Sequence, residues 1–306
     1  MKKIIAVIVS VVLAAGFVHA QDLEEVTNLF NEAATALNNG DKTAALDQFN
    51  KVLELATALG DEGNDIASNC KTTIPKIVLS IAKDLVKAED YDNAVTKLKE
   101  AAAFEDADVA SEANELIPQV IKQKGASLLK DKDYAGAAEV FKGIVAENPE
   151  DGASALRLGQ ALNALGNSDE AIAAFEKAAA NGQEGTANKQ ISNIYLKKAA
   201  ASLKEKAYAD AVASAVKACD YAENSQAWQI AGQASQLAGK NADAINYFEK
   251  YLEAAPSAKN AGQIAYTIGA LYQTNKNNDK AKEYYTKALS DPKYGAEAKK
   301  LLDALK

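Results

Sequence analysis

The side chains that most enzymes use for chemistry are scarce in this 306-residue chain. Its only histidine is His19, and its only cysteines are Cys70 and Cys219. His19 belongs to an N-terminal segment that we expect to be removed, so the mature chain has no imidazole for a nucleophile pair, a general base or most zinc sites. Two cysteines form neither a zinc cluster nor a disulfide framework. We expect no catalytic residues, no metal and no cofactor, and therefore no enzyme.

Carboxylates are the one plentiful reactive group, and they are densest at residues 61–65 and 105–108. Neither stretch follows the spacing of a calcium-binding loop, which alternates its ligands and ends on a distant Glu. The chain also lacks a glycine-rich phosphate loop and a Gly-x-Ser-x-Gly motif. We interpret both acidic stretches as solvated turns.

The overall charge excludes one class of partner. The chain has 34 basic and 42 acidic residues, a net charge of −8, and Arg157 is its only arginine. An acidic chain with so little arginine is not expected to bind nucleic acid. Its 48% of hydrophobic and 25% of charged residues are typical of a folded soluble protein.

The first twenty residues have the pattern of a secretory signal peptide. Lys2 and Lys3 precede an uncharged run over 4–18, and small residues lead to a cleavage site after Ala20. An uncleaved membrane anchor is the alternative, but the run is short for a bilayer core, which needs about 20 residues. Gln21 in place of cysteine excludes a lipid-attachment signal. We expect a periplasmic or secreted protein of a bacterial cell envelope, with no membrane span once the signal is removed.

One pattern recurs seven times along the rest of the chain. It consists of an alanine, a bulky apolar residue four positions later, and a small residue twelve positions before the alanine. The alanines are Ala45, Ala94, Ala137, Ala171, Ala211, Ala244 and Ala281. The residues four positions later are Phe49, Leu98, Phe141, Phe175, Ala215, Phe248 and Tyr285. The small residues are Ala33, Ala82, Gly125, Gly159, Ala199, Gly232 and Gly269.

This spacing predicts pairs of amphipathic helices. Apolar residues recur at i, i+3, i+4 and i+7 on both sides of a short polar turn. A small residue on the first helix lets the second helix pack closely against it. Each pair then leaves an apolar face that only the next pair can cover, so the stack must be continuous.

These residues resemble the tetratricopeptide repeat, whose pattern is Trp-x2-Leu-Gly-x2-Tyr, then Ala-x3-Phe, then Pro. The sixth copy matches best, with Trp228, Gly232, Ala244, Phe248 and Pro256. The resemblance implies an all-α, right-handed superhelical solenoid of about seven helix-turn-helix repeats with a C-terminal capping helix. After signal peptide 1–20, the implied array covers 21–306, with repeats at approximately 26–59, 75–108, 118–151, 152–185, 192–224, 225–258 and 262–293 and a capping helix at 294–306.

Three features depart from the pattern. The segment Leu59–Thr73 is extra sequence that lengthens a helix or forms a loop. Ala215 stands where a ring is expected, so we expect Ala215→Phe to stabilise the fold modestly. Cys219 falls on a core position about three repeats from Cys70, which predicts no intramolecular disulfide. An exposed Cys70 would be able to pair between molecules.

The resemblance also implies a concave binding groove. Its side chains come from positions 2, 5, 6, 9, 12 and 13 of each first helix, where the recurring alanine is position 20. None of these 42 residues, called here the groove positions, is Asp or Glu, although about six would be expected by chance. The candidate partner-binding residues among them are Lys83, Lys87, Lys122, Lys130, Arg157, Gln160, Asn163, Lys197, Gln229, Gln233, Gln236, Tyr266 and Gln273.

The lysines and glutamines at the groove positions indicate a peptide partner. Lysines suit carboxylates, and we expect Lys83, Lys87, Lys122 and Lys130 to form one basic patch. Glutamines both donate and accept, which suits an extended peptide backbone. Position 9 is never Asn, so we do not carry over the clamp that some family members use for chaperone tails.

We therefore expect a protein-interaction scaffold that binds an extended, neutral-to-acidic peptide segment of a protein partner. The alternative is a module that binds envelope glycan or peptidoglycan through Tyr266 and amide side chains, which a clustered aromatic platform would favour. The sequence does not indicate an oligomeric state.

Overall fold

The structure is a computed structural model that describes residues 20–305. The predicted signal peptide 1–20 therefore lies outside the described residues, except for Ala20, which begins the first helix. Helices joined by turns make up the described part, and no strand occurs in it. The all-α class and the architecture of consecutive helix pairs are confirmed.

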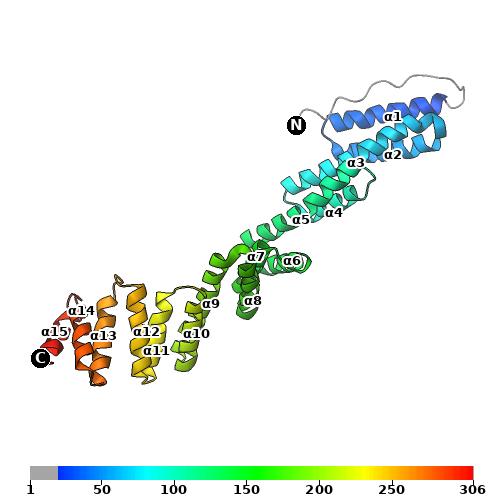
Figure 1. Ribbon diagram of the computed structural model, residues 1–306. Coiled ribbons are helices and arrows are strands. Elements are labelled where there is room, and N and C mark those ends of the chain that lie inside the picture. The colour runs from blue at the N-terminus through cyan, green and yellow to red at the C-terminus, as the bar shows by residue number, and fades with distance from the viewer. Residues whose placement is uncertain (1–19, 306) are drawn as a thin grey trace. The chain divides into compact units, whose positions relative to one another are not determined.

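The helices follow one another as seven pairs and a final single helix (Figure 1). The pairs are α1 (Ala20–Asn38) with α2 (Lys42–Ala58), α3 (Asn64–Lys87) with α4 (Tyr91–Ala102), α5 (Ala107–Lys130) with α6 (Tyr134–Glu147), α7 (Gly152–Ala164) with α8 (Ser168–Ala178), α9 (Glu184–Lys204) with α10 (Tyr208–Tyr221), α11 (Ser225–Leu237) with α12 (Asn241–Ala254), and α13 (Ala261–Thr274) with α14 (Asn278–Ala288). Helix α15 (Gly295–Ala304) follows, and two short turns are η1 (Gly60–Gly63) and η2 (Ala179–Gln183).

The chain divides into two compact units, one ending at Val140 and one beginning at Phe141. In the first unit, Phe30 and Phe49 meet edge to face with ring centroids 5.4 Å apart in the core of α1 and α2. In the second unit, α11 to α14 lie side by side (Figure 1), and Phe248 and Tyr285 are buried among them. Each unit thus has a core made by neighbouring helix pairs.

A ring opposite a glycine sets the packing inside several pairs. A Cβ built on Gly159 would lie 2.6 Å from the ring of Phe175, and one on Gly269 would lie 2.7 Å from the ring of Tyr285. Only a residue without a side chain leaves room for these rings. The fifth pair differs, because Ala199 and Ala215 are both buried in a cluster of small residues.

The turn inside every pair has the same backbone conformation at the same place. The residue five positions before the recurring alanine has φ between 60° and 86° in all seven pairs. These residues are Gly40, Glu89, Lys132, Gly166, Lys206, Gly239 and Lys276. Helices commonly end with one residue in the left-handed conformation. Here this residue reverses the direction of the chain, so that the second helix can pack against the first.

The segment Leu59–Thr73 forms η1 and the first part of α3, so it lengthens a first helix rather than looping out. Helices α3 and α5 each have 24 residues and continue through Pro75 and Pro118, where the repeats were expected to begin. Both helices therefore begin about eleven residues before the repeat starts that the resemblance implied.

Helix α15 covers the end of the second unit. Leu301, Leu302 and Leu305 are half-buried against the core that contains Tyr285 and Ala298. Its apolar side is thereby covered, as a terminal helix of a repeat array requires.

Candidate functional site

The groove positions are almost all accessible in the structure. Of the 42, only Phe30 and Leu79 are buried, and the other side chains are exposed or half-buried. All thirteen candidate partner-binding residues belong to the accessible group.

A hollow of about 390 Å³ lies between the first helices α9 and α11 of the second unit. Its lining consists of Leu196, Lys197, Ala200, Gln226, Gln229, Ile230 and Gln233. All seven are groove positions, and three of them, Lys197, Gln229 and Gln233, are candidate partner-binding residues. The structure thus brings groove positions of two neighbouring first helices together at one hollow.

The hollow has an apolar part and a polar part. Leu196 and Ile230 are half-buried and pack against the cluster of small residues that includes Ala199 and Ala215. Three glutamines of α11 supply amide groups, and the ammonium of Lys197 is the only charge among the lining residues. No carboxylate lines the hollow, so it suits a neutral or acidic ligand.

The other candidates of α7 and α11 are accessible but do not line this hollow. The guanidinium carbon of Arg157 lies 6.0 Å from the centroid of the Phe141 ring. Gln160 and Gln236 are exposed, and Asn163 is half-buried.

Two candidates on α13 contact other side chains of the second unit. The ring centroid of Tyr266 lies 5.8 Å from that of Tyr285 and 5.2 Å from that of Tyr294. The side-chain carbonyl of Gln273 accepts a hydrogen bond from the Tyr285 hydroxyl at 2.7 Å. Burial raises the pKa of Tyr285 to about 12. Tyr266 therefore packs against other rings of the second unit, and Gln273 is held by a hydrogen bond within it.

Two lysines of the predicted basic patch in the first unit have acidic partners. Lys83 forms an ion pair with Glu112 at 2.6 Å, and Lys87 forms one with Asp84 at 2.7 Å. Asp84 also pairs with Lys42, and the hydrogen bonds from Lys42 and Lys87 lower its pKa. Acidic residues beside the groove positions thus offset part of the lysine charge.

The candidates Lys122 and Lys130 complete the first unit's set. Both are exposed on α5.

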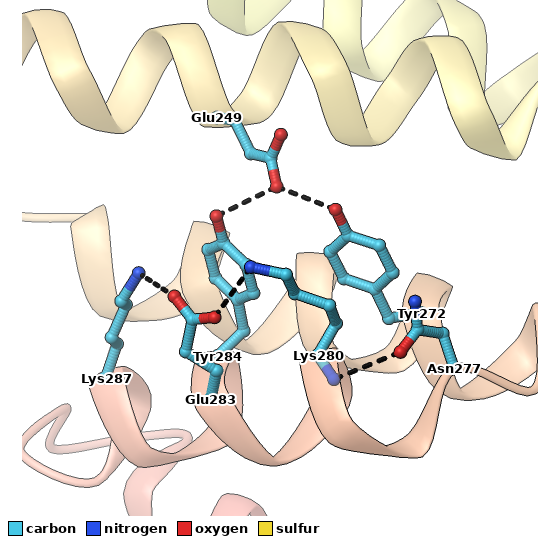
Figure 2. A network of polar contacts seen from close by, with 7 residues as sticks. All are labelled: Glu249, Tyr272, Asn277, Lys280, Glu283, Tyr284 and Lys287. Atoms are coloured by element: carbon cyan, nitrogen blue, oxygen red, sulfur yellow. Dashed lines mark hydrogen bonds and ion pairs between the residues drawn. The ribbon is translucent and has the colours of Figure 1, made fainter.

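A polar network joins three helices at the end of the second unit (Figure 2). One carboxylate oxygen of Glu249 on α12 accepts hydrogen bonds from the hydroxyls of Tyr272 on α13, at 2.8 Å, and Tyr284 on α14, at 2.9 Å. Burial and the bond to Glu249 raise the pKa of Tyr272 to about 12 and also raise that of Tyr284. No local sequence pattern predicts this network, because the tyrosines are 23 and 35 residues from Glu249.

Glu283 bridges two lysines on the outer side of the same network. It pairs with Lys280 at 2.9 Å and with Lys287 at 2.8 Å, as Figure 2 shows. The hydrogen bonds from Lys287 and Lys280 lower the pKa of Glu283 to about 2.

Trp228 is half-buried and engaged on its ring faces. It stacks on Tyr247 with centroids 5.9 Å apart, and the ammonium of Lys250 lies 4.5 Å from the Trp228 centroid. A second hollow, of about 490 Å³, is lined by Trp228 and Lys250 together with Glu223, Glu253 and Ala254. Because Tyr247 and Lys250 already contact the indole, the ring is not an open stacking platform.

Both cysteines, Cys70 and Cys219, are free thiols in the structure. Cys70 is fully buried and Cys219 is half-buried. Burial raises the pKa of each thiol to about 11. Pairing of Cys70 between molecules would require an exposed thiol, so the structure contradicts that alternative.

Between residues 20 and 305, no cluster of three His, Cys, Asp or Glu side chains is arranged to hold a metal ion. No helix in this range combines the length and the apolar character that crossing a membrane requires.

Comparisons with known proteins agree with the repeat pattern. Two family models described as tetratricopeptide repeat match the chain, one over residues 128–188 and the other over residues 225–257 and 262–290. No curated protein is similar to the chain in sequence.

Among solved structures, a crystal structure of MamA protein is 19% identical, with a TM-score of 0.36, and the match covers 58% of this chain and 93% of MamA. A structure of pilF from Pseudomonas aeruginosa is 18% identical, with a TM-score of 0.32, and the match covers 61% of this chain and 82% of that one. At such low TM-scores, neither structure bears on the function of this chain.

Proposed function

Because this chain is a tetratricopeptide repeat protein, we propose that it is an interaction scaffold that binds an extended, neutral-to-acidic peptide segment of a partner protein. We propose further that the segment lies along the first helices of the pairs. Helix-pair arrays present long, accessible faces rather than enclosed pockets, which suits an extended chain.

The observation that carries this proposal is the composition of the hollow between α9 and α11. It combines apolar, amide and ammonium groups, and its lining contains no carboxylate in a protein with net charge −8. Amide groups can donate to a peptide carbonyl and accept from a peptide N–H, which satisfies a backbone in extended conformation. An ammonium attracts carboxylates on the segment.

We also propose that the protein works outside the cytoplasm, in the periplasm or after secretion. This part depends on the signal-peptide pattern of residues 1–20. Mass spectrometry of the mature protein tests it, and we expect an N-terminus at Gln21. An intact N-terminus on protein from the envelope fraction would contradict cleavage.

Site-specific photo-crosslinking tests the binding proposal. A photoreactive phenylalanine derivative replaces Gln160 or Gln236, which are exposed groove positions, or Lys177 or Ala173, which are exposed on the second helix α8. We expect crosslinks to one partner from the groove positions only, mapping to a single linear segment of it. Crosslinks from α8 without crosslinks from the groove positions would show that the partner binds a different face.

A further inference from the structure

We propose that the hollow between α9 and α11 receives one apolar side chain of the bound segment, and that Lys197 pairs with a carboxylate close to it in the segment. This inference rests on the proposed function and specifies the chemistry that the site recognises. The partner sequence would then carry an aliphatic residue with an Asp or Glu within about three positions of it.

The size of the hollow limits what it can hold. Its volume of about 390 Å³ lies near the lower end of ligand sites, which span about 300–1,000 Å³. Such a space accommodates one or two side chains rather than an element of a folded domain. An extended segment that inserts a single anchor residue matches this size.

The floor of the hollow explains the preference for an apolar anchor. Leu196 and Ile230 present half-buried aliphatic side chains, and Ala200 adds a small exposed one. Beneath them lie the buried alanines of the fifth and sixth pairs, including Ala199 and Ala231. An aliphatic side chain placed here removes apolar surface from water on both partners, which favours binding.

The glutamines at the rim of the hollow indicate how many residues of the segment the site contacts. Gln226, Gln229 and Gln233 are three and four positions apart, so they form a row along one side of α11. With a rise of about 1.5 Å per residue, the row is about 10 Å long, which equals about three residues of extended chain. The amide row thus matches the backbone of the anchor residue and its immediate neighbours.

The charges around the hollow determine the sign of the neighbouring residue. Lys197 lies on α9, opposite the glutamine row, and is exposed. In the first unit, Lys83 and Lys87 have Glu112 and Asp84 as partners, whereas no carboxylate lines this hollow. An acidic residue of the segment therefore meets an ammonium here without a competing carboxylate in the lining.

A positional-scanning library of nonapeptides, with four consecutive positions varied over all residues in a Gly-Ser background, tests the inference on the full mature chain. We expect selection of an aliphatic residue with Asp or Glu within three positions of it. Replacement of the selected aliphatic residue by Ala, in the same peptide, should weaken binding by about tenfold. Selection of basic residues, or no selection, would overturn the inference.

A matched pair of variants locates the binding site. Ala200→Glu adds bulk and negative charge inside the hollow, whereas Ala201→Glu makes the same change at the next residue of α9, which does not line it. We expect a loss of about tenfold or more for Ala200→Glu and of less than about twofold for Ala201→Glu. Equal effects of the two variants would overturn the inference, and circular dichroism checks that both remain folded.

The two proposals can fail separately. If crosslinks come from Gln160 and Gln236 while Ala200→Glu binds the library peptides normally, the scaffold proposal stands and the anchor proposal falls. If no first-helix position crosslinks, the scaffold proposal falls. Lys197→Gln adds a last check, since it should remove the preference for Asp over Asn and leave the aliphatic preference intact.

Discussion

The ring of Phe248 on α12 occupies the space that a side chain on Gly232 of α11 would need. A Cβ at Gly232 would lie 2.5 Å from Cδ1 of that ring, which is closer than two non-bonded carbon atoms can approach. The two helices of the sixth pair therefore pack through the contact between Gly232 and the Phe248 ring. This contact requires the separation of sixteen residues between the glycine and the phenylalanine in the sequence.

Gly232→Ala should therefore destabilise the protein. Helix propensity favours alanine by about 1 kcal/mol, but overpacking against Phe248 should give a net loss of about 1–3 kcal/mol. Gly143→Ala is the matched control, because a Cβ at Gly143 in α6 meets no atom within 4 Å. We expect a gain of up to about 1 kcal/mol there. Urea unfolding measures both, and equal effects would contradict the packing argument.

The turns offer four positions for stabilisation. Glu89, Lys132, Lys206 and Lys276 have φ near +60°, where a side chain is unfavourable and glycine is not. Lys206→Gly or Lys276→Gly should each raise the free energy of unfolding by about 0.5–1 kcal/mol. The reverse change, Gly166→Ala, should lower it by a similar amount, and thermal unfolding would show both. A loss of stability in the glycine variants would mean that these lysine side chains make contacts of their own.

Substitution at Ala215 tests the packing of the fifth pair. The sequence favoured a modest gain from Ala215→Phe, but the structure buries Ala215 completely in a cluster with Ala199. We therefore expect a loss of about 1–3 kcal/mol, because a ring would have to displace buried neighbours. The double variant with Ala199→Gly, which imitates the Gly232–Phe248 pair, should recover part of that loss. No recovery would show that the spacing between α9 and α10 cannot adjust.

Stability should fall in strongly alkaline solution. The pKa of Tyr272 and that of Tyr285 are raised to about 12 from an ordinary value of 10.0. Their neutral forms are favoured in the folded state, so this contribution is present below pH 10 and is lost between pH 10 and about 12. Urea unfolding between pH 9 and 12 would show the decline. Tyr272→Phe should make it less steep, and an unchanged slope would exclude this residue as a source.

Charge in the first unit should affect partner binding. Lys122→Glu with Lys130→Glu should weaken binding of the crosslinked segment by about 1–3 kcal/mol and reduce its salt dependence. Lys71→Glu with Lys99→Glu is the control, since these exposed lysines are not groove positions. Titration at two salt concentrations measures both variants. If the control loses as much affinity, the effect is one of net charge and not of the first helices.

The sequence predicted what local spacing determines. The recurring alanine and the residue twelve positions before it indicated which helices pair, and the contacts at Gly159 and Gly269 follow that rule. The same counting assigned Leu196 and Gln233 to the first-helix groove positions, and the structure shows that they line one hollow although they belong to different repeats.

Features that depend on the approach of several helices were not predictable. Glu112 meets Lys83 from the next first helix, and Glu249 meets tyrosines from two other helices. The length of α5 was not predicted, whereas a longer helix was one of the two alternatives for the extra sequence at the start of α3. These errors concern side-chain partners and helix ends, not the order of the helices.

The constant position of the left-handed turn residue has a consequence for how such a chain can change in length. Distances between recurring alanines range from 33 to 49 residues, yet the small residue, the turn residue and the alanine keep the same separation in all seven copies. All variation in length therefore occurs between pairs. An insertion inside a pair would separate a ring from its glycine, whereas duplication or removal of a complete pair leaves every such contact intact. The helix pair is thus the unit by which recombination can extend or shorten this protein.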